Sequence, residues 1–206
     1  PVHATTLVDD YTGGGEKAYW FSTSGGTVGL VTAHEKRTWP DHAARTRDEY
    51  TWTQQPVSGN WYIGTVVNKL VEPGNPTPLQ KTTTQTLDAY GNVTDTVRND
   101  WGDVNPRTYH NDYLVTSNYV RNRLTVSKLT PPGGTQFTLV TNTYDVYTSY
   151  ICGQSAALTD LPGSALEHDA SYGTSYTVRG NLSYRDDASG RSCAVYDTGG
   201  NVLKSV

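Results

Sequence analysis

The sequence contains no methionine, only two phenylalanines and only five glutamates among its 206 residues. Alanine and leucine are also sparse, which argues against long helices, and no run approaches the roughly 18 apolar residues of a membrane span. The net charge is −4 and the basic residues are not clustered, so no nucleic-acid partner is expected. No signal peptide opens the chain, and the start at Pro1 without any methionine predicts a processed or excised piece.

The residues that are abundant favour strands and turns. Threonine occurs 31 times and tyrosine 15 times, and there are five tryptophans, all of which prefer strands. Twenty glycines and ten prolines supply frequent turns. The sequence therefore predicts an all-β fold, in which antiparallel β-hairpin repeats form a curved sheet or spiral. Helical periodicity is found only at 40–50 and 164–170, where a turn or two of helix is expected.

Two long hairpins can be located from alternation and turn residues. The alternating stretch 60–72 is broken by the proline- and glycine-rich 73–78 and returns over 79–87. The same plan recurs in a second pair, in which 121–130 runs to Pro131 and its neighbours and 135–147 comes back. Proline cannot donate to a strand ladder, so these clusters must lie between strands.

The last third of the chain contains a tighter repeat. Gly180-Asn181-Leu182 returns 20 residues later as Gly200-Asn201-Val202, which indicates stacked hairpins. An aspartate before such a turn can fold its carboxylate back onto backbone N–H groups, and the glycine takes the positive φ that closes the hairpin. The residues expected at these turns are Asp88, Gly91, Asn92, Gly180, Asn181, Asp197, Gly200 and Asn201.

Four motifs carry a resemblance to a known family. They are Tyr196-Asp197 with Gly200-Asn201-Val202, Leu87-Asp88 with Gly91-Asn92-Val93, the partial Arg179-Gly180-Asn181-Leu182, and Tyr144-Asp145. The chain thereby resembles the RHS or YD-repeat family over most of 35–206. The resemblance implies a β-hairpin ribbon that spirals into a hollow shell, as in bacterial RHS toxins, the cocoon of insecticidal toxin complexes and the teneurins.

The resemblance also implies a domain plan and a role. It predicts one fragment over 1–206, with a weakly matching lead-in at 1–34, degenerate long hairpins at 35–177 and tight YD repeats at 178–206. In this family the shell encloses or presents something and is not catalytic, apart from a self-cleaving segment at its end. Neither that aspartyl segment nor a toxin domain is found here, so self-cleavage and toxicity are not carried over.

The two cysteines, Cys152 and Cys193, leave two alternatives open. Their even number and the Thr-, Tyr- and Gly-rich background are typical of exported β proteins, in which the pair would form a disulfide. The other alternative is two buried free thiols.

No catalytic, cofactor or metal site is predicted. The stretch that begins at His34 has Thr38 where a zincin helix needs its second histidine. The carboxylate–histidine neighbours at 41–42 and 167–168 are explained by loop polarity, and an Asp-based glycosidase or autoprotease is the weakest functional class considered. Calcium is a minor alternative at two acidic clusters, namely Asp100, Asp103 and Asn105, and Asp186 and Asp187.

The aromatic residues separate the two remaining functional classes. The rings of Trp20, Trp39, Trp52, Trp61 and Trp101 and of the tyrosines could stack on sugars, but we favour cross-strand packing. We therefore expect a non-catalytic structural module of a secreted bacterial RHS/YD-repeat protein, extracellular or at the cell surface. It would form part of a β-shell, or stack on copies of itself into a fibre or tube. The alternative is a carbohydrate-binding, adhesin-like module that recognises surface glycans.

Overall fold

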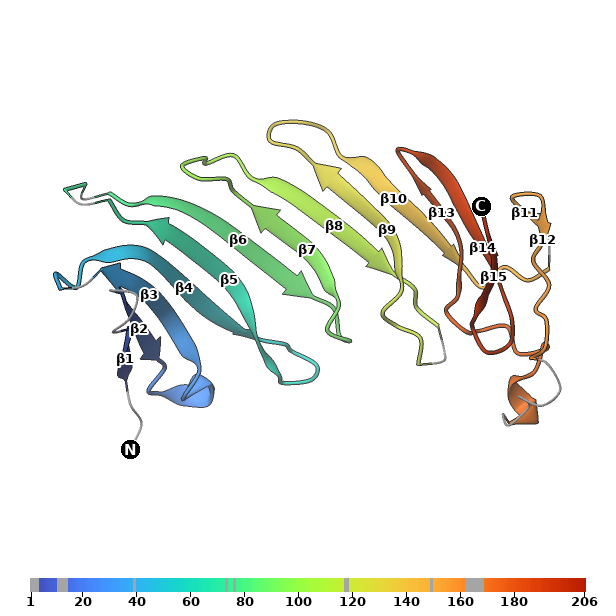
Figure 1. Cartoon of the computed structure of the whole chain (residues 1–206), viewed down its shortest axis with the longest axis horizontal. Coiled ribbons are helices and arrows are strands. Elements are labelled where there is room, and N and C mark those ends of the chain that lie inside the picture. The colour runs from blue at the N-terminus through green and yellow to red at the C-terminus, as the bar shows by residue number, and fades with distance from the viewer. Residues whose placement is uncertain are drawn as a thin grey trace. The chain divides into compact units, whose positions relative to one another are not determined.

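The computed structural model describes residues 4–10, 15–38, 40–72, 74–75, 77–116, 119–148, 150–161 and 169–206. These residues form an antiparallel β structure in which the helical elements are the 3-10 turns η1 (Gly25–Thr27) and η3 (Ala170–Tyr172) (Figure 1). The predicted all-β, antiparallel fold is confirmed. Neither described turn has the length or the apolar character that a membrane-crossing helix requires.

The chain divides into two compact units, Pro1–Tyr109 with Thr130–Thr135 (unit 1) and His110–Leu129 with Gln136–Val206 (unit 2). This division into units does not test the predicted division into a lead-in (1–34), long hairpins (35–177) and tight repeats (178–206), which stays a prediction. Unit 1 contains β1 (Thr5–Asp10), β2 (Gly15–Phe21), β3 (Val31–Thr38), β4 (Ala44–Gln54), β5 (Trp61–Leu70), β6 (Leu79–Leu87) and β7 (Val93–Arg98). Strand β8 (Arg107–Tyr113) contributes residues to both units.

Unit 2 continues the same plan with one interruption. It contains β9 (Leu124–Thr130) except for its last residue, β10 (Phe137–Tyr144), β11 (Tyr150–Ile151), β12 (Gln154–Ser155), β13 (Leu182–Asp187), β14 (Gly190–Tyr196) and β15 (Val202–Ser205). Thirteen strands follow one another in the sheet in chain order from β1 to β15. The exception is that β10 pairs with β13, while β11 and β12 pair with each other in a separate small sheet.

The two long hairpins predicted from the sequence are confirmed. Strand β5 pairs with β6 from Thr65 opposite Thr84 to Leu70 opposite Leu79, around the proline-rich turn. Strand β9 pairs with β10, with Phe137 opposite Leu129. The alternation of apolar and polar residues in these segments therefore gave the correct element type.

The helix expected at 40–50 is wrong, because residues 44–50 belong to strand β4. The hairpin turn before this strand is closed by the Thr38 hydroxyl, which donates to the Asp41 carboxylate over 2.6 Å, and by the Thr38 N–H, which donates to Ala43 O over 3.0 Å. His42 takes a positive φ of 51° in the turn. Pairing with strands on both sides outweighs the local helical pattern. The other expected helix, 164–170, falls largely outside the described residues.

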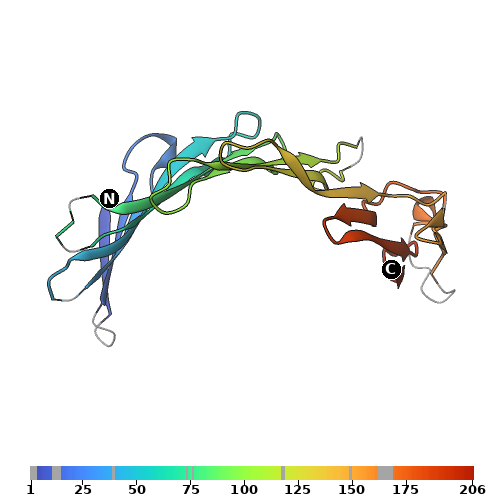
Figure 2. The same ribbon diagram turned by 90° about the horizontal axis from the view of Figure 1, so that it is seen from above.

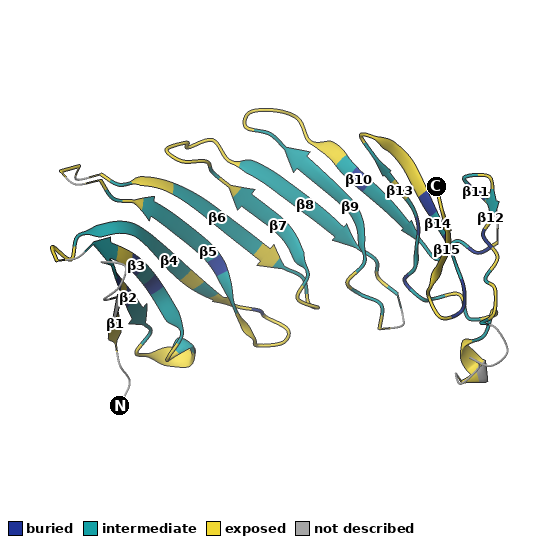
Figure 3. Ribbon diagram, viewed as in Figure 1, coloured by how far each residue is buried: buried dark blue, intermediate teal, exposed yellow. Residues whose placement is uncertain are grey.

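Little of unit 1 is deeply buried, because its strands lie in one layer (Figures 2 and 3). The buried apolar residues on one face of it are Ala18 and Ala33, which lie in register with Glu35 and Trp20. Side chains on one face of a sheet are close neighbours, so the longer glutamate and tryptophan cover the small alanines. Unit 1 is therefore held together mainly by ladder hydrogen bonds and rows of long side chains.

Unit 2 has a small hydrophobic cluster where the segment between β10 and β13 lies on the sheet. Ile151 and Ala156 of this segment pack with Cys193 and Val195 of β14, and each is at most 8% exposed. Val146, Cys152 and Tyr184 surround the cluster. The cluster supplies the second layer that unit 1 does without.

Candidate functional site: corner turns and an aromatic groove

The turn between β6 and β7 is closed by the carboxylate of Asp88. One carboxylate oxygen, Oδ1, accepts the backbone N–H groups of Tyr90 (2.8 Å) and Asn92 (2.9 Å), and Oδ2 accepts the Asn92 side-chain amide (2.8 Å). The Asp88 N–H donates to Asn92 O over 2.9 Å. Gly91 has a φ of 86°, which glycine adopts without steric cost.

The turn between β14 and β15 repeats this arrangement bond for bond. Asp197 Oδ1 accepts the N–H groups of Gly199 and Asn201, both over 2.9 Å, and its Oδ2 accepts the Asn201 side-chain amide over 2.9 Å. The Asp197 N–H donates to Asn201 O over 3.1 Å, and Gly200 has a φ of 82°. The two residues between aspartate and glycine differ between the turns, so the Asp, Gly and Asn define this corner.

A third corner of the same kind is built from two distant segments. The Asp145 N–H donates to Asn181 O (2.9 Å), and its carboxylate accepts the N–H groups of Asn181 (2.9 Å) and Gly180 (2.8 Å). Residues 146–179 stand where two residues stand in the other corners. In the sequence, Tyr144-Asp145 and Gly180-Asn181 are separate partial motifs, and no local signal indicates that they form one corner.

In the Asp145 and Asp197 corners, the tyrosine before the aspartate donates a hydrogen bond to the preceding strand. The hydroxyl of Tyr196 donates to Leu182 O over 2.9 Å, and that of Tyr144 donates to Leu124 O over 2.8 Å. Burial raises the pKa of both hydroxyls, which keeps them protonated as donors. Leu87 occupies this place in the Asp88 corner and has no hydroxyl to donate.

Side chains also link each corner to a neighbouring turn of its unit. In unit 1 the side-chain amide of Gln55, in the turn between β4 and β5, donates to Asp88 O over 2.9 Å. In unit 2, Arg123 Nε, just before β9, donates to Gly180 O over 3.0 Å, and Arg179 Nη1 donates to Thr198 O over 2.7 Å. The bond from Arg179 to Thr198 joins the Asp145 corner to the Asp197 corner.

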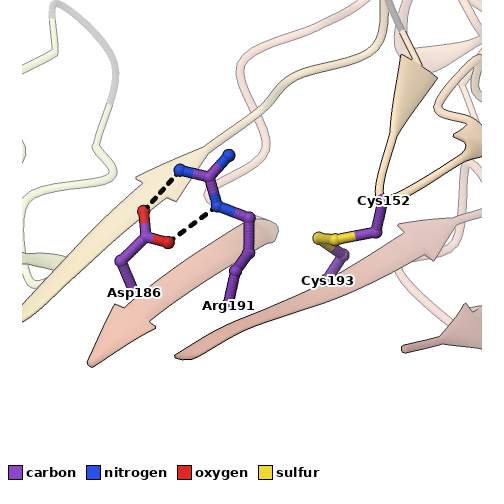
Figure 4. The surroundings of a disulfide bond; sticks show 4 residues. All are labelled: Cys152, Asp186, Arg191 and Cys193. Atoms are coloured by element: carbon purple, nitrogen blue, oxygen red, sulfur yellow. Dashed lines mark hydrogen bonds and ion pairs between the residues drawn. A yellow bond between two sulfur atoms is a disulfide. The ribbon is translucent and has the colours of Figure 1, made fainter. Parts of the chain in front are cut away.

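The insertion in the third corner is fastened to the sheet covalently. Cys152 of the insertion and Cys193 of β14 form a disulfide whose Cα atoms are 6.2 Å apart (Figure 4). Further along the insertion, Thr159 O accepts the N–H of Thr198 over 2.9 Å. The disulfide therefore joins the insertion to the hairpin that follows it.

Unit 1 carries a groove with an aromatic lining on one sheet face. Its volume is about 420 Å³ and it is lined by Tyr19, Val31, His34, Tyr50, Trp52 and Ile63, which come from strands β2 to β5. The Tyr19 and His34 rings stack at a centroid distance of 5.6 Å and an interplanar angle of 23°. The indole N–H of Trp52 donates to Val31 O over 2.8 Å.

A polar row runs across the strands beside the groove and shares His34 with the groove lining. His34, Asp48 and Asn68 lie opposite one another in β3, β4 and β5. The Asp48 carboxylate accepts the Asn68 side-chain amide over 2.6 Å and lies 3.2 Å from His34 Nδ1. Burial, followed by the nearby Asp48 carboxylate, raises the pKa of Tyr50. Sequence reasoning did not find this row, because it depends on the register of three strands.

The opposite face of unit 1 carries an ion-pair network of alternating sign. Glu35 accepts from Arg37 Nε and from Arg47 Nη1, both over 2.7 Å. The chain of pairs continues through Arg47 to Glu49 (2.8 Å) and from Glu49 to Lys69 (2.8 Å). The hydrogen bond from Lys69 is the largest cause that lowers the pKa of Glu49.

The Trp20 ring lies within this network and against its arginines. The guanidinium of Arg47 is 4.8 Å from the ring centroid and that of Arg37 is 5.4 Å from it. Beyond Arg37, Glu16 pairs with Arg37 (3.1 Å) and with His42 (2.8 Å). Every carboxylate of the network thus has two cationic or histidine partners.

The acidic and histidine motifs singled out in the sequence have local partners. Asp100 pairs with Arg107, Asp186 pairs with Arg191 through two contacts of 2.7 Å (Figure 4), and Asp187 pairs with Arg185 over 2.8 Å. Asp103 accepts the N–H of Asn105 over 2.8 Å. Among the described residues no group of three or more His, Cys, Asp or Glu side chains could hold a metal ion. Residues 3, 39 and 167–168 lie outside the described residues.

Comparison with known protein families and with curated proteins found no match. The resemblance to YD-repeat proteins therefore rests on the sequence motifs alone, and it stays a prediction.

Proposed function

We propose that this chain is a non-catalytic structural module of a secreted bacterial RHS/YD-repeat protein, located outside the cell or at its surface. The observation that carries the proposal is the shared hydrogen bonding of the Asp88, Asp145 and Asp197 corners. All three corners share the bond from the aspartate N–H to the asparagine carbonyl and the bond from the asparagine N–H to the aspartate carboxylate, and such recurrence is what a repeated hairpin unit requires. The disulfide supports export, because disulfides persist in oxidising compartments.

The partner of the module is a neighbouring repeat of its parent protein or a second copy of itself. Strand β15 pairs with β14 alone among the described strands, and Val202 and Leu203 are 56% and 49% exposed. A strand with a free edge is a template for pairing with another strand. Addition of copies at such an edge is a head-to-tail contact, which gives a fibre or tube when it does not close.

A proline at Ser205 tests the self-stacking form of this proposal. Val206 and Cys193 exchange two backbone hydrogen bonds of 3.0 and 2.7 Å, so by alternation the Ser205 N–H points away from β14. Ser205→Pro removes that outward donor and leaves the β14 pairing in place. We expect concentration-dependent assembly of the native chain in sedimentation velocity and negative-stain images, and none for Ser205→Pro.

Ser205→Ala is the matched control and should assemble as the native chain does. A native chain that stays a 22.5 kDa monomer at every concentration would contradict self-stacking and leave the parent's own repeats as the partner.

Carbohydrate binding is the second candidate function. The observation that favours it is the groove of unit 1, which is lined by tyrosine and tryptophan rings and by His34, the residue that contacts the Asp48 carboxylate beside the groove. Ligand sites combine apolar walls with a few placed polar groups in this way. A panel of surface glycans tests the function on the whole chain.

A further inference from the structure

We propose that the aromatic groove of unit 1 is a binding site for a neutral oligosaccharide, with one pyranose ring against Trp52 and the hydroxyl groups of a neighbouring sugar unit toward Asp48, which lies four residues before Trp52 on β4. The proposal rests on the second candidate function and gives it a site and a ligand class. The groove volume of about 420 Å³ lies within the range of small-molecule sites.

The aromatic walls are held in place before any ligand arrives. The indole of Trp52 is fixed by its hydrogen bond to Val31 O, so the ring cannot turn without losing a partner. Tyr19 is fixed on the other side by its stacking on His34. A ring that is already ordered loses little conformational freedom on binding, which favours affinity.

The polar row provides hydrogen-bonding groups beside the groove, next to its lining residue His34. Each carboxylate oxygen of Asp48 has two lone pairs, and the bonds to Asn68 and His34 leave capacity to accept ligand hydroxyls. The Tyr50 hydroxyl remains protonated, because its pKa is raised, and it can donate. A sugar offers an apolar C–H face and hydroxyl edges, so it matches the rings and the polar row together.

Other ligand classes fit the groove less well. Asp48 repels anions, and an apolar chain would desolvate the carboxylate without giving it a partner. An organic cation would be attracted to Asp48, because the bond from the neutral Asn68 amide leaves the carboxylate charge in place, but a quaternary ammonium has no N–H to donate to the remaining lone pairs. A neutral ligand with hydroxyl groups can donate to them, and titration with choline separates the two classes.

The test is titration of the full chain with neutral hexasaccharides of glucose, xylose, mannose and N-acetylglucosamine, followed by calorimetry and saturation-transfer NMR. We expect at least one to bind, and Trp52→Ala to raise its Kd about tenfold or more. Tyr50→Phe keeps the ring and removes the hydroxyl, and it should weaken binding less. Trp101→Ala is the matched control, because Trp101 is 39% exposed, lies over Lys81 outside the groove, and belongs to the same unit.

The outcomes separate the site from the function. If none of these neutral saccharides binds the folded native chain, the proposed site falls, and the panel of surface glycans decides separately whether the carbohydrate-binding function falls with it. If a saccharide binds equally well to native protein, Trp52→Ala and Tyr50→Phe, the function stands and this site is wrong. If Trp52→Ala does not fold, Asp48→Asn decides, and unchanged affinity in that variant overturns the proposal. Binding of choline in place of any saccharide would assign the groove to cations and overturn it as well.

Discussion

The aspartate of each corner does more than occupy a turn. Its carboxylate gathers backbone N–H groups that a hairpin end would otherwise leave to water, and it does so in the same way at Asp88 and Asp197. Burial pushes the pKa of both carboxyls up, but hydrogen bonds from Asn92 or Asn201 and from backbone N–H groups outweigh it and hold the pKa below its ordinary value. The folded state therefore binds fewer protons at these sites than the unfolded chain.

Acidification should consequently destabilise the corners. A depressed folded-state pKa contributes stability that is complete above the ordinary aspartate pKa and is lost as the pH falls through the folded value. We expect the free energy of unfolding, from urea titrations, to fall between about pH 5 and about pH 3. The double variant Asp88→Asn, Asp197→Asn should show a shallower fall.

Glu35 is the residue on which the ion-pair network of unit 1 depends. It is 7% exposed and accepts from two arginines, so its removal leaves Arg37 and Arg47 short of a partner. We expect Glu35→Ala to lower the free energy of unfolding by about 1–3 kcal/mol. Asp112→Ala, which breaks a more exposed pair with Lys128, should cost less. Equal losses in urea denaturation would show that the network contributes nothing beyond a surface pair.

At the scale of elements, the hairpins could be predicted from the sequence, but only some of the corners that connect their strands could be. The Asp88 and Asp197 corners could be predicted because donor and acceptor lie within five residues. The third corner could not, since Asp145 and Gly180 are separated by the insertion. Strand β4 was mistaken for helix because its pairing with two neighbouring strands is not visible locally. The groove and the ion-pair network were missed for the same reason.

The insertion should be dispensable for the corner that it interrupts. Replacing 146–179 with Ala-Tyr, as in the Asp88 corner, and Cys193 with Ser should let Asp145 and Gly180 close a continuous turn. We expect β10 and β13 to keep slow amide hydrogen exchange, because their pairing lies outside the insertion.

The matched control is the same deletion with Asp145→Ala, which lacks the acceptor and should be less stable by about 1–3 kcal/mol. Fast exchange throughout β10 and β13 in the first variant would mean that the insertion is needed to build the corner.

At the scale of the whole molecule, the two compact units can be observed separately. All five tryptophans occur in residues 1–109, which belong to unit 1, whereas the disulfide lies in unit 2. Strands in a repeat array contact their neighbours, so stability is a sum of local terms. The loss of an interaction within one unit should therefore lower the stability of that unit and leave the stability of the other unchanged.

Reduction of the disulfide should thus weaken unit 2 selectively. The bridge closes a loop with a sequence separation of 41, for which the chain-entropy account gives roughly 4 kcal/mol. We expect Cys152→Ser or added reductant to speed amide exchange in 136–206 and to leave the tryptophan fluorescence transition in urea unchanged. A shift of both signals by the same amount would show that the units unfold as one.

The split corner at Asp145 and Gly180 is suited to the insertion of a foreign peptide. The chain leaves the sheet after Asp145 and returns to it at Gly180, and these two points are joined by hydrogen bonds under 3 Å. The spacing of the flanking strands β10 and β13 therefore does not depend on the segment inserted between them. A peptide inserted at this corner would be displayed at the end of a hairpin while the sheet keeps its structure. The Asp88 and Asp197 corners are equivalent positions for such an insertion.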